Sequence, residues 1–192
     1  WFPEPRYKTE DDLFWPDLKA KAEKRIAARK PDGRRHLVAL VAWKEAFETA
    51  RAGDGKETSP RITVHDRDAN ERAAAAVAVL EHLKVYQPTL AELRTASTRP
   101  RIRYPVDYKL DEPFSILLPH LSIIKGAVQE LSLQSCAALA AGRSEEAFQD
   151  VQLMFWLTES PRDEPFLTSQ LVRIACLQIT TQAIWEGIAQ HK

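Results

Sequence analysis

The residues best placed to do chemistry are a histidine and an arginine in the apolar C-terminal half of the chain, His120 and Arg173. Imidazole is a common general base near neutral pH, and a guanidinium group binds anions through paired N–H groups. Both side chains are therefore candidate binding residues, while no catalytic residue can be assigned. His120 follows a proline at the start of a predicted helix, where a hydrogen bond to neighbouring backbone is the more ordinary role.

Arg173 is the only formal charge in residues 165–185. Burying an unpaired guanidinium is prohibitive, so Arg173 must reach solvent, bind an anionic ligand or pair with a carboxylate. We favour the ion pair. Asp150 lies ten residues before the predicted turn at 160–163 and Arg173 ten residues after it, so the two should lie at similar heights. Asp150 or Glu146 is therefore the expected partner.

No motif for phosphate binding, zinc-dependent hydrolysis, a serine nucleophile or dithiol redox chemistry occurs in the sequence. The five histidines share no ligand spacing, so we expect no metal and no cofactor. Cys136 and Cys176 lie in apolar helical segments, where we expect buried thiols, with a disulfide between packed helices as the alternative. These absences favour a non-enzymatic protein without excluding an enzyme, because catalytic groups can converge from distant segments.

The charge balance argues against a nucleic-acid partner. The 192 residues include 27 basic and 27 acidic side chains, so no net basic field attracts a polyanion. The three arginines in residues 99–103 do not change this. The longest runs without formal charge have 12 residues, too few for a helix to span a bilayer, so we expect a membrane link only through an anchor outside this chain. Because the chain begins at Trp1 rather than Met, we expect a fragment or a processed form.

The elements that position these residues are predicted to be helices. Apolar residues recur at helical spacing between proline and glycine breaks, which predicts an all-α fold of about seven helices. Their approximate bounds are residues 11–29, 34–52, 68–86, 88–96, 114–141, 144–159 and 164–190. The last three should form an antiparallel, hairpin-like core. Pro119 either kinks the fifth helix or marks its true beginning. A short β-like run at residues 62–65 is interpreted as an extended connector.

Composition divides the chain into two parts. Residues 1–112 carry 41 charges, whereas residues 113–192 carry 13. Helices that are apolar around most of their circumference are central, and strongly charged helices are peripheral. We therefore expect an apolar helical core at 113–192, an irregular connector at 97–112, and charged helices at 1–96 that pack on the core or extend from it, all within one domain.

Two resemblances accompany this pattern. Residues 137–148 read Ala-Ala-Leu-Ala-Ala-Gly-Arg-Ser-Glu-Glu-Ala-Phe, which resembles the turn of a tetratricopeptide-type helical hairpin over about 30 residues. The later Ala and Pro of that repeat are replaced by Met154 and Glu159, and no second copy follows. The chain also resembles a family of uncharacterised bacterial helical proteins, often membrane-anchored.

The residues that carry this second resemblance are 103–108 (Arg-Tyr-Pro-Val-Asp-Tyr), 118–121 (Leu-Pro-His-Leu) and 169–175 (Ser-Gln-Leu-Val-Arg-Ile-Ala), within a region of roughly 68–185. It implies a helical fold and an extracytoplasmic, anchored location, and it supplies no activity.

The sequence therefore predicts a non-enzymatic helical interaction or scaffold module with a protein or peptide partner. The alternative is an enzyme or a small-ligand-binding domain with a site near His120 and Arg173. The helix predicted at 164–190 is apolar almost all round, which leaves a homodimer open unless the N-terminal helices cover the remaining face.

Overall fold

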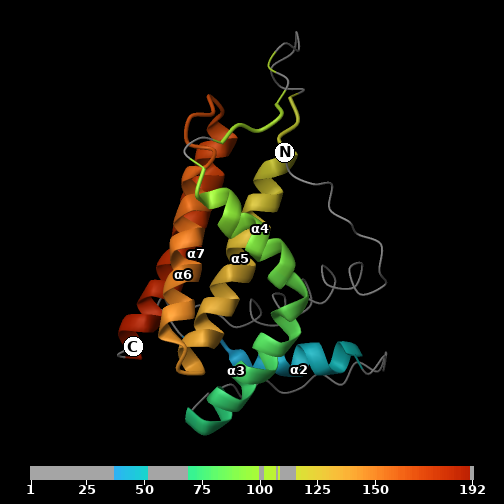
Figure 1. Cartoon of the computed structure of the whole chain (residues 1–192), viewed down its shortest axis with the longest axis vertical. Helices are drawn as coiled ribbons and strands as arrows, with labels where there is room; N and C mark the ends of the chain where they lie inside the picture. The colour runs from blue at the N-terminus through green and yellow to red at the C-terminus, as the bar shows by residue number, and fades with distance from the viewer. Residues whose placement is uncertain (1–36, 52–68, 100–101, 107, 109–115, 191–192) are drawn as a thin grey trace. The chain divides into compact units, whose positions relative to one another are not determined.

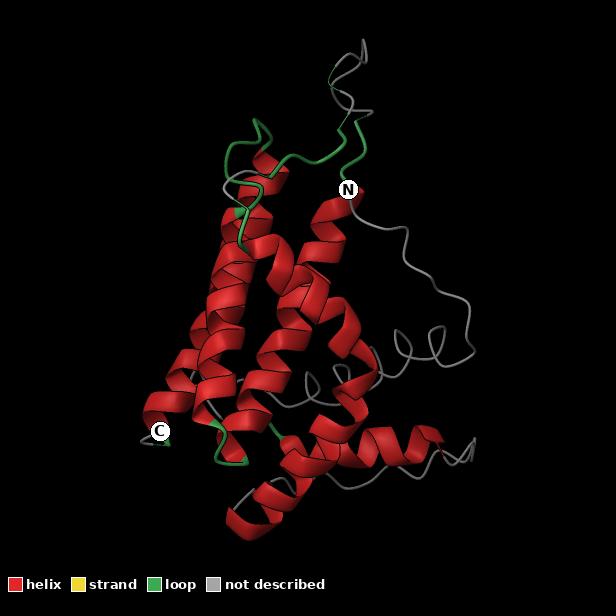
Figure 2. Cartoon of the chain, viewed as in Figure 1, coloured by secondary structure: helices red, strands yellow, loops and turns green. Residues whose placement is uncertain are grey.

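The structure is a computed structural model that describes residues 37–51, 69–99, 102–106, 108 and 116–190. Among these residues the regular secondary structure is entirely helical (Figure 2), which confirms the all-α class. The chain divides into two compact units, residues 1–82 and residues 83–192. The predicted helix at 11–29 and the predicted connector at 62–65 lie outside the described residues, so the total of about seven helices is not tested.

The first unit contains α2 (Leu40–Arg51) and nearly all of α3 (Ala69–Leu83). Apolar residues of α2 spaced three or four apart are buried: Leu40, Trp43 and Phe47. The Phe47 ring stacks on the imidazole of His82, in the last turn of α3, with ring centroids 4.8 Å apart. Near the start of α3, Arg72 donates a 2.7 Å hydrogen bond to the backbone carbonyl of Val38. Ring stacking and this hydrogen bond thus connect the α2 region to both ends of α3.

The described residues of the second unit form a short 3₁₀ turn and four α-helices, three of which lie side by side (Figure 1). Helix α5 packs against both α6 and α7, α6 also packs against α7, and α4 packs against α6. All nine residues from 131 to 139 are buried, so α5 is the central helix of the unit. The elements are η1 (Lys84–Tyr86), α4 (Gln87–Ser97), α5 (Pro119–Ala140), α6 (Ser144–Glu159) and α7 (Leu167–Ala189).

Pro119 is the first residue of α5, so the proline marks the beginning of the helix rather than a kink inside it. Helix α7 begins three residues later than predicted. Phe166, which precedes it, is extended at φ −99° and ψ 134°, so Glu164 and Pro165 belong to the connection rather than to the first turn. This longer connection changes which residues of α6 and α7 lie at the same height.

The link between α5 and α6 is only three residues long, and it reverses the chain direction (Figure 1). Gly142 has φ +78°, the left-handed conformation that ends many helices. Its N–H donates to the carbonyl of Leu139 at 3.1 Å, and the N–H of Arg143 donates to the carbonyl of Ala138 at 2.8 Å. These two bonds form a Schellman motif, which satisfies the last carbonyls of α5. Beyond the turn, Ala138 and Ala147 pack together and allow the two helices to approach closely.

The two glycines of this region should respond in opposite directions to alanine. No atom lies within 4 Å of a Cβ built at Gly142 or Gly126, so neither substitution causes a clash. At Gly142 the positive φ makes alanine strained, and we expect a loss of about 1 kcal/mol in the free energy of unfolding. Gly126 lies inside α5, where alanine should stabilise by roughly 0.5–1 kcal/mol. Urea unfolding of the two variants measures both changes, and equal signs would contradict this account.

Cys136 and Cys176 are both free and fully buried, as expected from the apolar segments that contain them. Burial also raises the pKa of the Cys176 thiol, against a smaller opposing effect of the Lys125 charge. The thiols therefore act as small apolar core groups.

Candidate functional site

His120 and Glu164 form a buried pair where α5 begins and where the connection to α7 lies. The Nε2 atom of His120 is 2.7 Å from Oε1 of Glu164, and both side chains are more than nine-tenths buried. The contact has the distance of an ion pair but does not meet the angles of a hydrogen bond. The other carboxylate oxygen of Glu164 accepts a hydrogen bond from the hydroxyl of Ser169, in the first turn of α7. Glu164 thus joins the first turns of α5 and α7.

Tyr104 closes this cluster from the segment before α5. Its ring stacks on the imidazole of His120, with centroids 4.2 Å apart and ring planes 14° apart. Its hydroxyl shares a hydrogen bond with the hydroxyl of Ser160, at the end of α6. Burial raises the pKa of the Tyr104 phenol, the bond to Ser160 opposes this, and the negative charge of Glu164 adds to the rise. Tyr104 therefore stays neutral. Together with His120 and Glu164, it connects four segments of the unit: its own segment, the start of α5, the end of α6 and the connection to α7.

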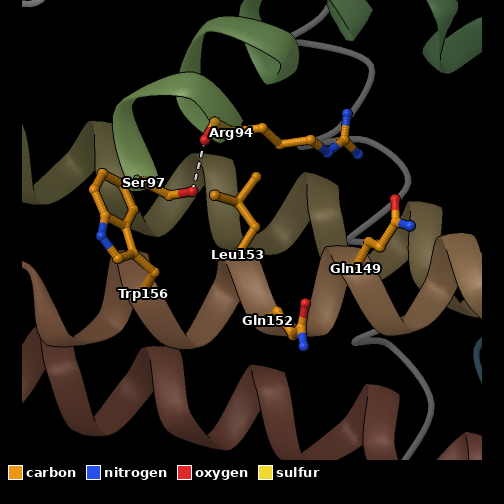
Figure 3. Close-up of a pocket in the computed structure, with 6 residues that line it drawn as sticks. All are labelled: Arg94, Ser97, Gln149, Gln152, Leu153 and Trp156. Carbon is orange, nitrogen blue, oxygen red and sulfur yellow. Dashed lines mark hydrogen bonds between the residues drawn. The ribbon is translucent and has the colours of Figure 1, made fainter. Parts of the chain in front are cut away.

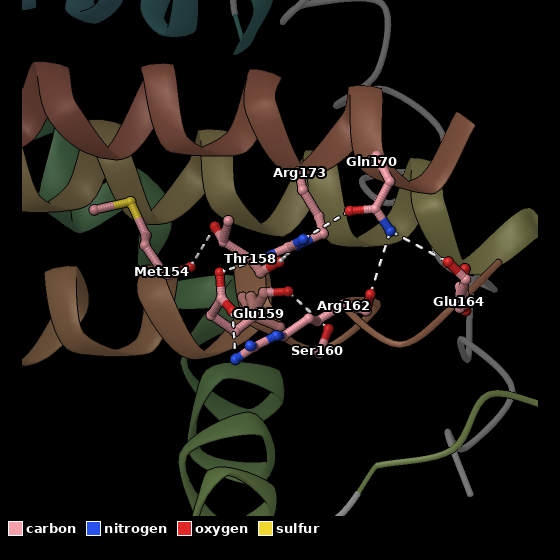
Figure 4. Close-up of polar contacts among 9 residues, drawn as sticks. Met154, Thr158, Glu159, Ser160, Arg162, Glu164, Gln170 and Arg173 are labelled. Atoms are coloured by element: carbon pink, nitrogen blue, oxygen red, sulfur yellow. Dashed lines mark hydrogen bonds and ion pairs between the residues drawn. The ribbon is translucent and has the colours of Figure 1, made fainter. Parts of the chain in front are cut away.

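Arg173 pairs with Glu159, the last residue of α6, and not with the expected partner. Its Nη2 atom lies 2.7 Å from Oε1 of Glu159, its Nη1 donates to Oε1 of Gln170 at 2.7 Å, and its Nε donates to the carbonyl of Thr158 at 3.3 Å. Figure 4 shows these contacts converging on the guanidinium. All three guanidinium nitrogens are thus directed either to the end of α6 or to α7 itself.

The prediction of Asp150 or Glu146 as the partner of Arg173 is wrong. Because α7 begins at Leu167, Arg173 lies in its second turn, level with the last turn of α6 and not with its middle. Instead, Oε2 of Glu146 lies 3.6 Å from Nη1 of Arg143 at the exposed start of α6.

Gln170 connects the two candidate residues that the sequence singled out. Its amide nitrogen donates to the backbone carbonyls of Arg162 and Glu164, both at 3.2 Å, while its oxygen accepts from Arg173 (Figure 4). His120 and Arg173 therefore belong to one polar end of the unit, joined through Glu164 and Gln170. The structure does bring the two predicted residues to the same region, but each is directed at its own carboxylate.

A second buried polar network, which sequence reasoning missed, is centred on Asp150. This carboxylate is fully buried, lies 2.6 Å from Nη2 of Arg94 on α4, and accepts a 2.9 Å hydrogen bond from Gln134 on α5. Gln134 in turn accepts a hydrogen bond from Gln87 at 2.9 Å. Burial raises the pKa of Asp150, and the hydrogen bonds from Gln134 and Arg94 oppose that rise. The network fixes α4 against α5 and α6.

Beside this network is an open depression of about 380 Å³ between α4 and α6 (Figure 3). Its lining combines an indole, a leucine and four polar side chains: Arg94, Ser97, Gln149, Gln152, Leu153 and Trp156. Arg94 is already paired with Asp150, Ser97 donates to the carbonyl of Arg94, and Gln149 donates to Glu145. Neither His120 nor Arg173 lines it, so this depression is not the ligand site that the alternative hypothesis requires.

The His120 cluster does not have the arrangement of a catalytic triad. In such a triad the imidazole accepts the hydroxyl proton and a carboxylate orients the imidazole. Here the Ser169 hydroxyl donates to Glu164 and not to His120. The described residues contain no group of three or more His, Cys, Asp or Glu side chains able to hold a metal ion. The arrangement can tie helix ends together, and it presents no activated nucleophile.

A different feature of the second unit faces solvent. Helix α7 exposes six aliphatic side chains along one side, and α6 exposes two phenylalanines; we call these residues the α6–α7 face: Leu167, Leu171, Ile174, Leu177, Ile184, Ile188, Phe148 and Phe155. Their exposed fractions run from 36% at Ile184 to 75% at Leu167. Of the two charged residues of α7, Arg173 is paired with Glu159 and Glu186 is fully buried. The exposed side of α7 therefore carries no free charge.

The Arg173–Glu159 pair sets the register of α6 against α7. Phe155 lies four residues before Glu159, and Leu177 lies four residues after Arg173, so both are about 6 Å along their helices from the ion pair. Phe148 lies 11 residues before Glu159 and Ile184 lies 11 residues after Arg173, so both are about 16 Å along their helices from the ion pair. Antiparallel neighbours thus place each phenylalanine level with an exposed aliphatic residue of α7.

No helix in the described part of the chain is long and apolar enough to cross a membrane. No family model, curated protein or solved structure matches the chain. The resemblances noted in the sequence are thus not supported by these comparisons.

Proposed function

We propose that this protein is a non-enzymatic helical interaction module that binds an amphipathic helix on the α6–α7 face. The observation that carries the proposal is the line of exposed aliphatic residues on a side of α7 without free charge. An amphipathic helix presents apolar anchors at positions i, i+3, i+4 and i+7, and such anchors need an apolar surface of matching length. Helix α7 has 23 residues and is therefore about 34 Å long, enough for several such anchors.

The size of the face also supports binding. The eight side chains together expose roughly 800 Å² of mostly apolar surface, above the largest patch of a typical monomer at about 300–600 Å² and near the contribution of each partner to an interface of standard size. Removal of apolar surface from water is the main favourable term in such association, at about 25 cal/mol per Å² before the costs of ordering.

The polar groups of the unit support this proposal more than the enzyme or small-ligand alternative. His120 and Arg173 each have a carboxylate partner inside the unit, and both contacts are 2.7 Å long. A ligand at either residue would have to displace that carboxylate. The alternative site near His120 and Arg173 thus gains no support from its geometry.

The test is selection from a displayed library of amphipathic helical peptides on the immobilised protein. We expect enriched peptides to lose affinity at least tenfold for Ile174→Glu, which places a charge in the face and removes an apolar contact. Ile123→Glu on α5 is the matched control, since Ile123 and Ile174 are 53% and 54% exposed. Peptides that bind both variants like the unsubstituted protein, or a library that yields no binders while the protein is monomeric, would reject the proposed function.

A further inference from the structure

We propose that the helix bound by the α6–α7 face is α7 of a second copy of this chain, packed antiparallel about a two-fold axis. The inference rests on the proposed function and names its partner. It follows from the pattern of exposure along α7, from the distribution of charge, and from the position of Phe155.

Eight of the ten exposed positions of α7 form a pattern that reads the same in both chain directions, and the two exceptions are Thr168 and Ala189. On the side that carries the face, residues 167, 171, 174 and 177 are exposed, and so are residues 178, 181, 184 and 188. Reversing the helix about the midpoint between 177 and 178 exchanges 167 with 188, 171 with 184, 174 with 181, and 177 with 178. These eight positions fall within an arc of about 140° at 100° per residue. Every exposed position of the stripe therefore meets an exposed position of the second copy.

A two-fold interface requires this property. In an isologous contact residue i of one copy meets residue j of the other, and j meets i, so the surface must be complementary to itself. Two of the resulting contacts are entirely aliphatic: Leu167 with Ile188, and Leu171 with Ile184. Ile174 meets Thr181, whose hydroxyl donates to the carbonyl of Leu177 at 2.7 Å and so presents its methyl group more readily. Leu177 meets the aliphatic stem of Gln178 near the axis.

Charge does not oppose the pairing of two identical faces. A face with a net charge repels its own copy, whereas a neutral one does not. The guanidinium of Arg173 is matched by Glu159, and the carboxylate of Glu186 is buried among its Gln182 and Gln190 neighbours. The stripe itself contains only aliphatic and neutral polar residues.

Phe155 places an aromatic anchor beside the axis. It lies level with Leu177, which is next to the midpoint of the palindromic stripe, and it is 43% exposed. An axis in the interface plane, perpendicular to α7, brings α6 of each copy to the same side, so Phe155 meets Phe155 of the second copy. Large aromatic residues near the centre of an interface commonly dominate its affinity.

Sedimentation velocity from 1 to 100 μM tests the association itself. We expect the unsubstituted protein to form a dimer in this range and Phe155→Glu to weaken it at least hundredfold, because two carboxylates would then face each other at the axis. Ile123→Glu should dimerise like the unsubstituted protein. The far-ultraviolet circular dichroism and melting temperature of each variant establish that it is folded. Monomer at 100 μM overturns the inference.

Cross-linking tests the antiparallel geometry. In the proposed dimer residue 167 lies opposite residue 188 of the second copy but about 30 Å from residue 167 of that copy. A short bismaleimide should therefore link an equimolar mixture of Leu167→Cys and Ile188→Cys, should not link either variant alone, and should link Phe155→Cys to itself. The native Cys136 and Cys176 are fully buried, so the unsubstituted protein provides the background. Linkage of Leu167→Cys to itself would overturn the antiparallel arrangement.

The two proposals fail separately in these experiments. A monomer whose face still binds library helices, with the loss at Ile174→Glu described above, rejects the second copy as the partner and leaves the interaction module standing. A monomer that binds no helix rejects both. A dimer that Phe155→Glu does not weaken assembles through another surface, which also rejects the inference.

Discussion

Replacing Asp150 with alanine is expected to lower the free energy of unfolding by about 3 kcal/mol, because a buried amide loses its acceptor and a cavity replaces the carboxylate. Asp150 is fully buried and is contacted by Arg94 at 2.6 Å and by Gln134 at 2.9 Å. Without the carboxylate, the Gln134 amide has lost its acceptor in the interior. Arg94 must then turn toward solvent through the open depression beside it. Urea unfolding followed by circular dichroism measures the loss.

Two variants separate the network from a general effect of losing a carboxylate. Asp150→Asn keeps the size and one acceptor oxygen, so we expect a smaller loss of about 1–2 kcal/mol. Glu146→Ala removes an exposed carboxylate on the same helix and should change stability by less than about 1 kcal/mol. A loss for Asp150→Ala no larger than that for Glu146→Ala would show that the network does not stabilise the unit.

The burial of Asp150 gives the pH dependence of the free energy of unfolding a definite sign. Burial raises the pKa of Asp150 above its usual range, so in the interval between the unfolded and folded values the folded state binds more protons. Stability contributed by this group is therefore fully present below the unfolded pKa and is lost as the pH rises through the folded pKa. The stability of the unsubstituted protein relative to Asp150→Asn should therefore fall as the pH rises from about 4 through the raised pKa of Asp150. A relative stability that instead rises with pH would mean that the partners of Asp150 outweigh its burial.

Much of the helical framework followed from local sequence signals. Gly142 and the turn at 160–163 bracket α6, whose observed bounds agree with the predicted ones. Pro119 sits at the position where a helix tolerates proline, and it begins α5. The start of α7 was misplaced because Pro165 is equally compatible with a first helical turn and with an extended connection, and only the extended Phe166 distinguishes the two.

The polar contacts did not follow from the sequence, because their partners are distant along the chain. Asp150 meets residues 56 and 16 positions away, and His120 meets Glu164 from another helix end. No periodicity links such pairs. A shift of three residues in the start of α7 was also enough to give Arg173 a different carboxylate. Likewise, the sequence showed α7 to be apolar almost all round, but the side that stays exposed depends on how α5 and α6 cover the other side.

Replacing Glu164 with alanine is expected to cost about 3 kcal/mol, the second large effect in the unit. Glu164 is the only carboxylate that contacts His120 among the described ion pairs, and it also accepts the hydroxyl of Ser169. Its removal leaves the buried Ser169 hydroxyl without its acceptor, at a cost of about 1–3 kcal/mol, and also removes the carboxylate that contacts the buried imidazole. Asp163→Ala is the matched control: this neighbouring carboxylate is exposed, and its loss should change stability by less than about 0.5 kcal/mol.

A double-mutant cycle with His120→Ala then measures the pair itself. If the imidazole and the carboxylate stabilise each other, the double variant should lose less than the sum of the single variants, by about 1–3 kcal/mol. His120→Ala alone also removes the stacking on Tyr104, but this loss is common to both sides of the cycle and cancels. Additive losses would show that His120 and Glu164 act independently. His120 would then again be a candidate for binding a ligand. A coupled pair would instead show that the histidine at the start of α5 helps to hold three helix ends together.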